Sequence, residues 1–201
     1  MVAASARWLR ERFALGSSEA AEAGDAGVEP DTKLISAAVL IPLVERDSGL
    51  TVLLTQRTAH LRDHAGQISF PGGRSEPGDE TPIMTALREA REEVGIAAEQ
   101  VEVLGVLRQY RTGTGFAVVP VVALVRPPLN LKLDDFEVAD AFEIPFDFLV
   151  NPRHHQRHCL EAGGASREYW AIPWQEYYIW GATAGMLVSL SRFIGAREDL
   201  R

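Results

Sequence analysis

Cysteine is almost absent from this chain, since Cys159 is the only one in 201 residues. A single cysteine excludes an internal disulfide and is typical of a protein kept in a reducing compartment. No apolar run approaches the roughly 20 residues that a membrane-spanning helix needs. The first residues, MVAASARWLRERFALG, lack the uninterrupted apolar core of a secretory signal, so a short amphipathic helix is the better interpretation. These absences predict a cytoplasmic protein that is not bound to a membrane.

Basic residues are also few, with 20 Lys and Arg against 28 Asp and Glu, a net charge of −8. That balance argues against a general nucleic-acid-binding surface, which is normally basic. An acidic protein can still bind a phosphorylated small molecule, provided that metal ions and a few well-placed arginines offset the negative electrostatic potential of the protein. The length is that of a single domain, with enough residues to bury a sizeable core.

Hydrophobic patterning indicates an α/β protein with a mixed β-sheet between α-helices. The predicted strands are 34–44 and 50–57, forming one hairpin, 101–111 and 116–125, forming a second, and two short strands at 141–144 and 169–174. The predicted helices span 81–94 and 179–195. Residues 17–30 are small and acidic and read as a linker. We therefore expect an N-terminal helix and acidic linker over 1–33 and the main domain over 34–201.

The helix from residue 81 carries clear signals at both ends. Thr81 is suited to the N-cap, Pro82 to the first helical position and Gly95 to the C-terminal stop. Its apolar residues recur at helical spacing and form one stripe that should face the sheet: Ile83, Leu87, Ala90 and Val94.

Three carboxylates, Glu89, Glu92 and Glu93, share another face of this helix. One interpretation is a solvated face with ordinary salt bridges. The other is a metal site, because the carboxylates sit at the helix end where the macrodipole disfavours negative charge. Only Arg88 and Arg91 are near enough to offset them. The preceding glycine-rich turn, 71–73, can also bring backbone carbonyls close, and clustered hard oxygens are what Mg²⁺ or Mn²⁺ requires.

The segment Arg88–Ile96, REAREEVGI, resembles the second half of the Nudix box, R-E-U-x-E-E-x-G-U, where U is aliphatic or small. The resemblance implies the Nudix fold and metal-dependent hydrolysis of a nucleoside diphosphate linked to another moiety. It implies that Mg²⁺ or Mn²⁺ is held by Glu89, Glu92, Glu93 and the carbonyl of Gly73. It also implies a catalytic set of Glu89, Arg88 and Glu92. In this set Glu89 is a metal ligand or the group that activates water, Arg88 orients Glu89, and Glu92 is a metal ligand.

The first half of the box departs from that pattern. Five residues after Gly73 the family usually has Glu, followed by seven residues before the Arg. Here Asp79 takes the Glu position and eight residues precede Arg88, so one residue is inserted. Neither Asp79 nor Glu80 is therefore assigned a role.

A second segment, LLTQRTAHLRDHAGQISFPGG over 53–73, resembles the pattern L-L-T-x-R-[SA]-x3-R-x3-G-x3-F-P-G-G of the coenzyme A pyrophosphatase branch, with Thr58 in place of Ser or Ala. The resemblance implies cleavage of coenzyme A into 3′,5′-ADP and 4′-phosphopantetheine. It implies that Arg57 and Arg62 bind substrate, together with the turn that contains Gly72 and Gly73. Arginine pairs bidentately with phosphate, whereas the alternative is that both arginines are surface charges paired with acidic residues.

Further candidates lie past the second hairpin. Glu137 is the expected extra metal ligand from an acidic stretch, although that stretch could also be a plain acidic loop. The histidines of 151–158, NPRHHQRH, favour a basic loop over a transition-metal site. Two rivals remain: a Nudix enzyme for another nucleotide, such as a nucleoside triphosphate, ADP-ribose or a dinucleotide, and a non-catalytic nucleotide-binding module. A homodimer is compatible with the fold.

Overall fold

A computed structural model describes residues 4–16, 23–24, 33–60, 65–162 and 165–195. The helices are α1 (Ala6–Ala14), α2 (Pro82–Val94), α3 (Phe146–Leu149) and α4 (Gly181–Ile194), with 3-10 turns η1 (Ala98–Gln100) and η2 (Pro152–His154). The strands are β1 (Ala23–Gly24), β2 (Ile35–Arg46), β3 (Gly49–Arg57), β4 (Ile68–Ser69), β5 (Gly72–Arg74), β6 (Val101–Val106), β7 (Tyr110–Arg111), β8 (Phe116–Val125), β9 (Val138–Pro145), β10 (Gln156–Ala162), β11 (Ala165–Trp174) and β12 (Tyr177–Trp180). None of the helices in these ranges is long and apolar enough to cross a membrane.

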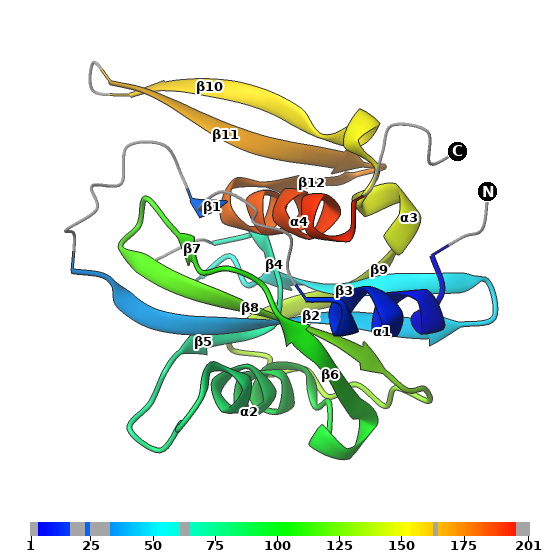
Figure 1. Ribbon diagram of the computed structural model, residues 1–201. Helices are drawn as coiled ribbons and strands as arrows, with labels where there is room; N and C mark the ends of the chain where they lie inside the picture. The colour runs from blue at the N-terminus through cyan, green and yellow to red at the C-terminus, as the bar shows by residue number, and fades with distance from the viewer. Residues whose placement is uncertain (1–3, 17–22, 25–32, 61–64, 163–164, 196–201) are drawn as a thin grey trace.

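Strand β2 is the centre of a mixed sheet of nine strands. It pairs in parallel with β8 and in antiparallel fashion with β3 and β5, and β3 pairs in turn with β4 and β9. A separate three-stranded antiparallel sheet, β10–β11–β12, lies beyond α4 (Figure 1). The pairing of β2 with β5 brings the glycine-rich turn against the centre of the large sheet, directly before α2.

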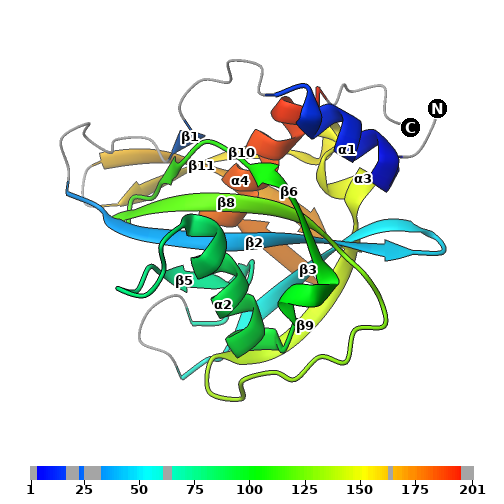
Figure 2. The same ribbon diagram turned by 60° about the horizontal axis from the view of Figure 1, so that its bottom comes forward.

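Alternate side chains of β2 serve two separate cores, as expected for a strand covered on both faces. Ile41 and Leu43 belong to the core beneath α4, whereas Leu40 and Val44 belong to the core beneath α2. Figures 1 and 2 show α2 on one face of the sheet and α1 and α4 on the other. The predicted α/β architecture, a mixed sheet between helices, is confirmed.

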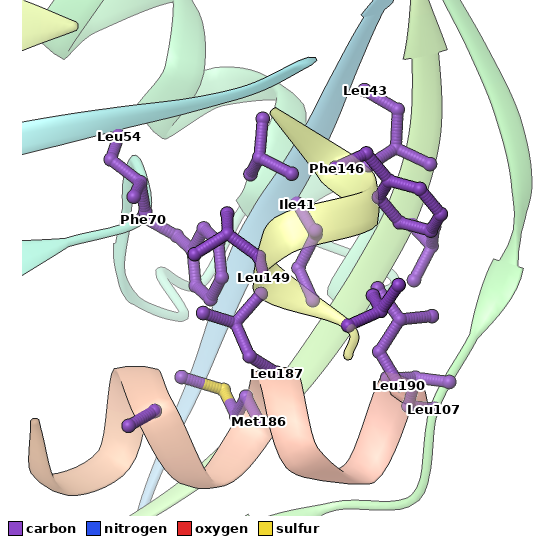
Figure 3. Packing of buried hydrophobic residues seen from close by; sticks show 14 of the residues in the cluster. Ile41, Leu43, Leu54, Phe70, Leu107, Phe146, Leu149, Met186, Leu187 and Leu190 are labelled. Atoms are coloured by element: carbon purple, nitrogen blue, oxygen red, sulfur yellow. The ribbon is translucent and has the colours of Figure 1, made fainter. Parts of the chain in front are cut away.

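The core beneath α4 is assembled from elements far apart in the chain. Leu187 and Leu190 of α4 pack with Leu149 of α3 and Ile41 of β2, all fully buried (Figure 3). Burying each such side chain stabilises the fold by about 1.5–3 kcal/mol. This core covers one face of β2 and β3, and helix α2, which carries the site described below, lies on the opposite face.

Helix α1 packs against the same core. Ser5 caps its N-terminus, Leu9 is fully buried, and the rings of Phe13 and Phe193 lie 4.5 Å apart. The Arg12 guanidinium donates to the carbonyl of Phe193 at 2.6 Å. The predicted N-terminal helix is therefore present. The predicted linker, 17–30, lies outside the described residues except for β1.

Both predicted hairpins are present, although the first strand of the second one is divided into β6 and β7. Two predictions are wrong. Ile179 and Trp180 belong to β12, because Gly181 has a φ of +63° and α4 begins only there. Residues 152–158 are not a basic loop, since η2 is followed by strand β10, which pairs with β11.

Candidate active site

Helix α2 has the bounds and caps that its residues predict. The Thr81 hydroxyl accepts from the amide of Met84 at 3.2 Å, and Gly95 ends the helix with a φ of +74°. The buried stripe is centred on Ala86, Ala90 and Val94. The predicted Ile83 and Leu87 lie at its half-buried edge, so the helix is rotated slightly from the predicted orientation. This rotation turns Glu93 toward the sheet.

Glu93 is a buried carboxylate, with 5% of the residue exposed. Its Oε2 accepts from the Gly72 amide at 3.2 Å, so β5 and α2 are joined by this contact. Burial raises the pKa of Glu93 to about 8, the Gly72 hydrogen bond opposes that rise, and the neighbouring charges of Glu89 and Glu137 add to it. A buried carboxylate among other carboxylates favours binding of either a proton or a cation.

Glu89 lies beside the glycine-rich turn. A Cβ at Gly73 would stand 2.5 Å from Glu89 Oε1, so the close approach of the two residues requires glycine. Burial raises the pKa of Glu89, while the adjacent Arg88 guanidinium lowers it. Glu89 is therefore a stronger base than an exposed glutamate.

Arg88 makes several of the polar contacts of α2. Its guanidinium donates to both carboxylate oxygens of Asp79, at 2.9 and 3.3 Å, to Glu89 and Glu92 at 2.9 Å each, and to the carbonyl of Arg74 at 3.0 Å. The hydrogen bond from Arg88 lowers the pKa of Asp79 to about 2. Asp79, to which the sequence analysis assigned no role, thus anchors Arg88.

The three predicted helix carboxylates do not all point the same way. Glu89 and Glu93 turn toward the sheet, whereas the Glu92 side chain is 59% exposed and pairs with Arg88. Glu80 is exposed at the start of the helix. The inner carboxylates are completed by Glu137, whose charge acts on both Glu89 and Glu93.

Arg57, at the end of β3, lies among these carboxylates. Its Nη1 is 4.0 Å from Glu93 Oε1 and its Nη2 is 3.8 Å from Glu137 Oε2. Its Nε is buried and has no hydrogen-bond partner within the described part of the chain. The predicted partner of Arg57 in substrate binding, Arg62, lies outside the described residues. Glu143 points elsewhere and pairs with Arg46 at 3.0 Å.

Most of the 53–73 motif builds the fold. Leu53, Leu54 and Phe70 are buried in the two cores, and the Thr55 hydroxyl donates to the carbonyl of Ser69 at 3.2 Å. A Cβ on the glycine before Gly73 would lie 2.5 Å from a carbonyl oxygen of β2. Arg57 is the described side chain of this motif that projects toward the carboxylates.

The oxygen atoms gathered at this site are of the kind that bind a hard divalent cation. Glu89, Glu93 and Glu137 are carboxylates that lie near one another, and Gly73 packs against Glu89. Over the described ranges, however, no three Asp, Glu, His or Cys side chains are yet grouped closely enough to coordinate one ion. Arg88 holds Glu92 away from the others. Metal binding by this set therefore requires side-chain rotation.

The histidines after α3 make contacts within the fold instead. His154 Nδ1 lies 2.9 Å from the carbonyl of Phe148, and His155 Nε2 lies 2.8 Å from the carbonyl of Leu149. His158 Nε2 lies 3.0 Å from the side chain of Gln156. One ring nitrogen of each of the three histidines is thus engaged by a group of the protein.

Comparison with known proteins identifies the family. The model of the NUDIX domain matches residues 34–159, more than half of the chain. The chain belongs to the Nudix family. Its reaction class is hydrolysis of nucleoside diphosphate derivatives, and Nudix hydrolases generally use divalent metal ions. The prediction of a Nudix hydrolase is therefore confirmed.

The relatives carry the same family name. A protein of Citrobacter koseri, described as an uncharacterized Nudix hydrolase NudL, is 44% identical over 161 residues, which cover 80% of this chain and 83% of that one. Its counterpart in Escherichia coli (strain K12) is 42% identical over 162 residues, with the same coverage. A solved Nudix hydrolase from M. smegmatis, RenU, has a TM-score of 0.50 and 23% identity, and the match covers 63% of this chain and 80% of that one. The structural likeness supports the fold alone.

Proposed function

We propose that this Nudix hydrolase cleaves the diphosphate bond of coenzyme A or its derivatives, giving 3′,5′-ADP and 4′-phosphopantetheine or its acyl form. The observation that carries the proposal is Arg57. The coenzyme A-type motif contains this arginine, and its guanidinium lies 4.0 Å from Glu93 and 3.8 Å from Glu137. A planar cation beside the carboxylates is suited to holding one phosphate of a diphosphate while a metal ion holds the other.

In this proposal the divalent cation is Mg²⁺ or Mn²⁺. The ligands are the carboxylates of Glu89, Glu92, Glu93 and Glu137 and the carbonyl of Gly73. When bound, the cation would supply Lewis-acid stabilisation of the negative charge on the diphosphate. Support comes from the Glu93 carboxylate, whose pKa is raised to about 8 chiefly by burial. A carboxylate that is costly to ionise when buried gains stability from a bound cation.

The protein residues carry the remaining steps. Glu89 accepts a proton from the attacking water, and its raised pKa suits a general base. The water oxygen bonds to phosphorus as the bridging phosphorus–oxygen bond breaks. Arg88, fixed by Asp79 at 2.9 Å, holds Glu89 in position. Arg57 and Arg62 bind phosphate, and the turn with Gly72 and Gly73 lies beneath the diphosphate.

Product analysis by chromatography and mass spectrometry tests the proposal. The protein is incubated with Mg²⁺ or Mn²⁺ and a panel of coenzyme A, dephospho-coenzyme A, ADP-ribose and nucleoside triphosphates. Metal-dependent release of 3′,5′-ADP, with coenzyme A preferred over the dephospho form, is the expected result. Preference for another nucleotide would overturn the coenzyme A assignment and leave the carboxylate site in place.

The rival from another class is a nucleotide-binding module without turnover. The buried Glu93 and the proton-accepting position of Glu89 favour an enzyme, because binding alone does not need both. Absence of turnover with every substrate of the panel would favour the module.

The proposal extends to the setting of the enzyme. The single cysteine supports a cytoplasmic location. The proposed Nudix domain runs over 34–201, after an N-terminal helix and linker over 1–33; the family match, over 34–159, begins at the same residue. A homodimer is the proposed assembly, and sedimentation analysis would test it.

A further inference from the structure

The loop between β8 and β9 bridges the two elements that carry the site. The Asp134 amide donates to the carbonyl of Glu93 at 2.9 Å, which ties the loop to the end of α2. The Thr58 amide donates to the carbonyl of Glu137 at 3.0 Å, and the Thr58 hydroxyl donates to the carbonyl of Phe136 at 2.8 Å. The loop is therefore fixed both to the carboxylate helix and to the residue after Arg57.

This fixed loop holds a large apolar side chain in solvent. Phe136 is 65% exposed, although its amide donates to Asp134 Oδ1 at 2.8 Å and its carbonyl is bound by Thr58. The phenyl ring has one described aromatic neighbour, His60, whose ring centroid lies 5.0 Å away at an interplanar angle of 58°. The exposed ring gains little of the stabilisation that burial would give it, so its face is available to a ligand.

The position of the ring relates it to the site. Phe136 directly precedes Glu137, whose carboxylate lies 3.8 Å from Arg57. His60 follows Arg57 by three residues along the same chain segment. A nucleotide held by Arg57 through a phosphate carries its base on the far side of the ribose, so an exposed aromatic ring in the adjoining loop is suited to meet that base. Bases stack on aromatic side chains irrespective of sequence, because every base has a π-face.

We propose that Phe136, with His60 beside it, is the platform on which the nucleobase of the substrate stacks. The inference deepens the proposed function and rests on the substrate being a nucleotide, but not on its being coenzyme A. Phe136 acts as a specificity-determining residue: it selects base-bearing diphosphates and takes no part in the bond-breaking step.

The test is equilibrium binding of AMP and of ribose 5-phosphate, which differ by the base, to the full chain in the presence of Mg²⁺. The unmodified protein should bind AMP roughly 5- to 150-fold more tightly, the range expected for one stacked base. Phe136→Ala and Phe136→Leu should lose that preference and leave ribose 5-phosphate binding unchanged, whereas Phe136→Tyr should retain it. Tyr178→Ala, which removes a 42% exposed aromatic ring from β12, is the matched control and should change neither affinity.

Two results would overturn the inference: equal affinity of the unmodified protein for both ligands, or a preference for AMP that survives in the Ala and Leu variants. Because Phe136 is exposed, both variants should fold, and circular dichroism verifies this. Steady-state kinetics adds a second readout, since Phe136→Ala should raise KM for base-bearing substrates with little change in kcat. The binding test needs no turnover, so failure of the coenzyme A assignment and failure of the platform give different results.

Discussion

Replacing Glu93 by Gln should stabilise the metal-free protein, and more so as the pH rises. Glu93 has a folded-state pKa of about 8, raised by burial, against an ordinary value near 4.5. A group whose pKa is raised by folding contributes full stability below its unfolded pKa and loses it as the pH rises through the folded value. Between pH 5 and 8 the folded protein therefore holds roughly half to one proton more than the unfolded chain at this position. At 1.36 kcal/mol per pH unit, the loss over that range is about 3 kcal/mol.

Glu93→Gln removes this loss, because a neutral amide is not charged at any pH in the range. Its oxygen can still accept from the Gly72 amide. Urea unfolding in a chelator, at pH 5 and at pH 8, should show the free energy of unfolding of the variant rising relative to the unmodified protein by about 3 kcal/mol. Glu92→Gln removes the same charge from an exposed position and serves as the control.

A difference that stays flat across this pH range, or that Glu92→Gln reproduces, would refute the account of Glu93 as a buried, destabilising carboxylate. The same variant should lose turnover, because the proposed metal site loses a ligand. Full turnover in Glu93→Gln would contradict the metal assignment even if the stability result held.

Three further predictions concern the surroundings of Glu93. Gly73→Ala should lower kcat at least tenfold with little change in Tm, because the new Cβ meets only the movable end of the Glu89 side chain. Gly72→Ala should instead lower Tm, because its Cβ meets the backbone of β2. Asp79→Asn should weaken the hydrogen bonding to Arg88 and lower kcat. In the unmodified protein, the stability that Asp79 contributes should be lost as the pH falls from about 4 through its pKa of about 2. The free energy of unfolding of the variant, measured over the same acid range, should lack this dependence on pH. Adding Mg²⁺ to 100 times its Kd should stabilise the unmodified protein by about 2.7 kcal/mol, and a chelator should reverse the shift in calorimetry.

Local signals explain what could be predicted about α2. Its caps, Thr81 and Gly95, act on backbone groups within one turn, so residue type alone specifies them. The burial of Glu93 could not be predicted in the same way. It depends on the pairing of β5 with β2, which brings the Gly72 amide to the helix, and a helical wheel contains no information about that pairing. The role of Asp79 could not be predicted for a similar reason. Asp79 precedes Arg88 by nine residues, and the two side chains meet only because of the conformation of the loop before α2.

The errors at the C-terminal side have different causes. Residues Gln156 to Cys159 of β10 are exposed, so this part of the strand shows no alternation of apolar side chains and is specified by pairing with β11. At the other end, Ile179 and Trp180 continue the apolar run of α4, and periodicity cannot divide a strand from a helix within such a run. The boundary is marked by the positive φ of Gly181 and by the pairing of Ile179 and Trp180 with β11.

The contact of α1 with the end of α4 bears on how the chain folds during synthesis. The carbonyl that Arg12 binds belongs to Phe193, 181 residues later. At the usual 5–20 residues per second, a ribosome needs roughly 10–40 s to make that stretch. Phe13 is therefore synthesised well before Phe193, the aromatic ring of α4 against which it lies. Helix α1 can meet β6 earlier, through the hydrogen bonds of Arg10 to Glu102. Its contacts with the end of α4 must wait, and the Phe13 ring is available to chaperones until then.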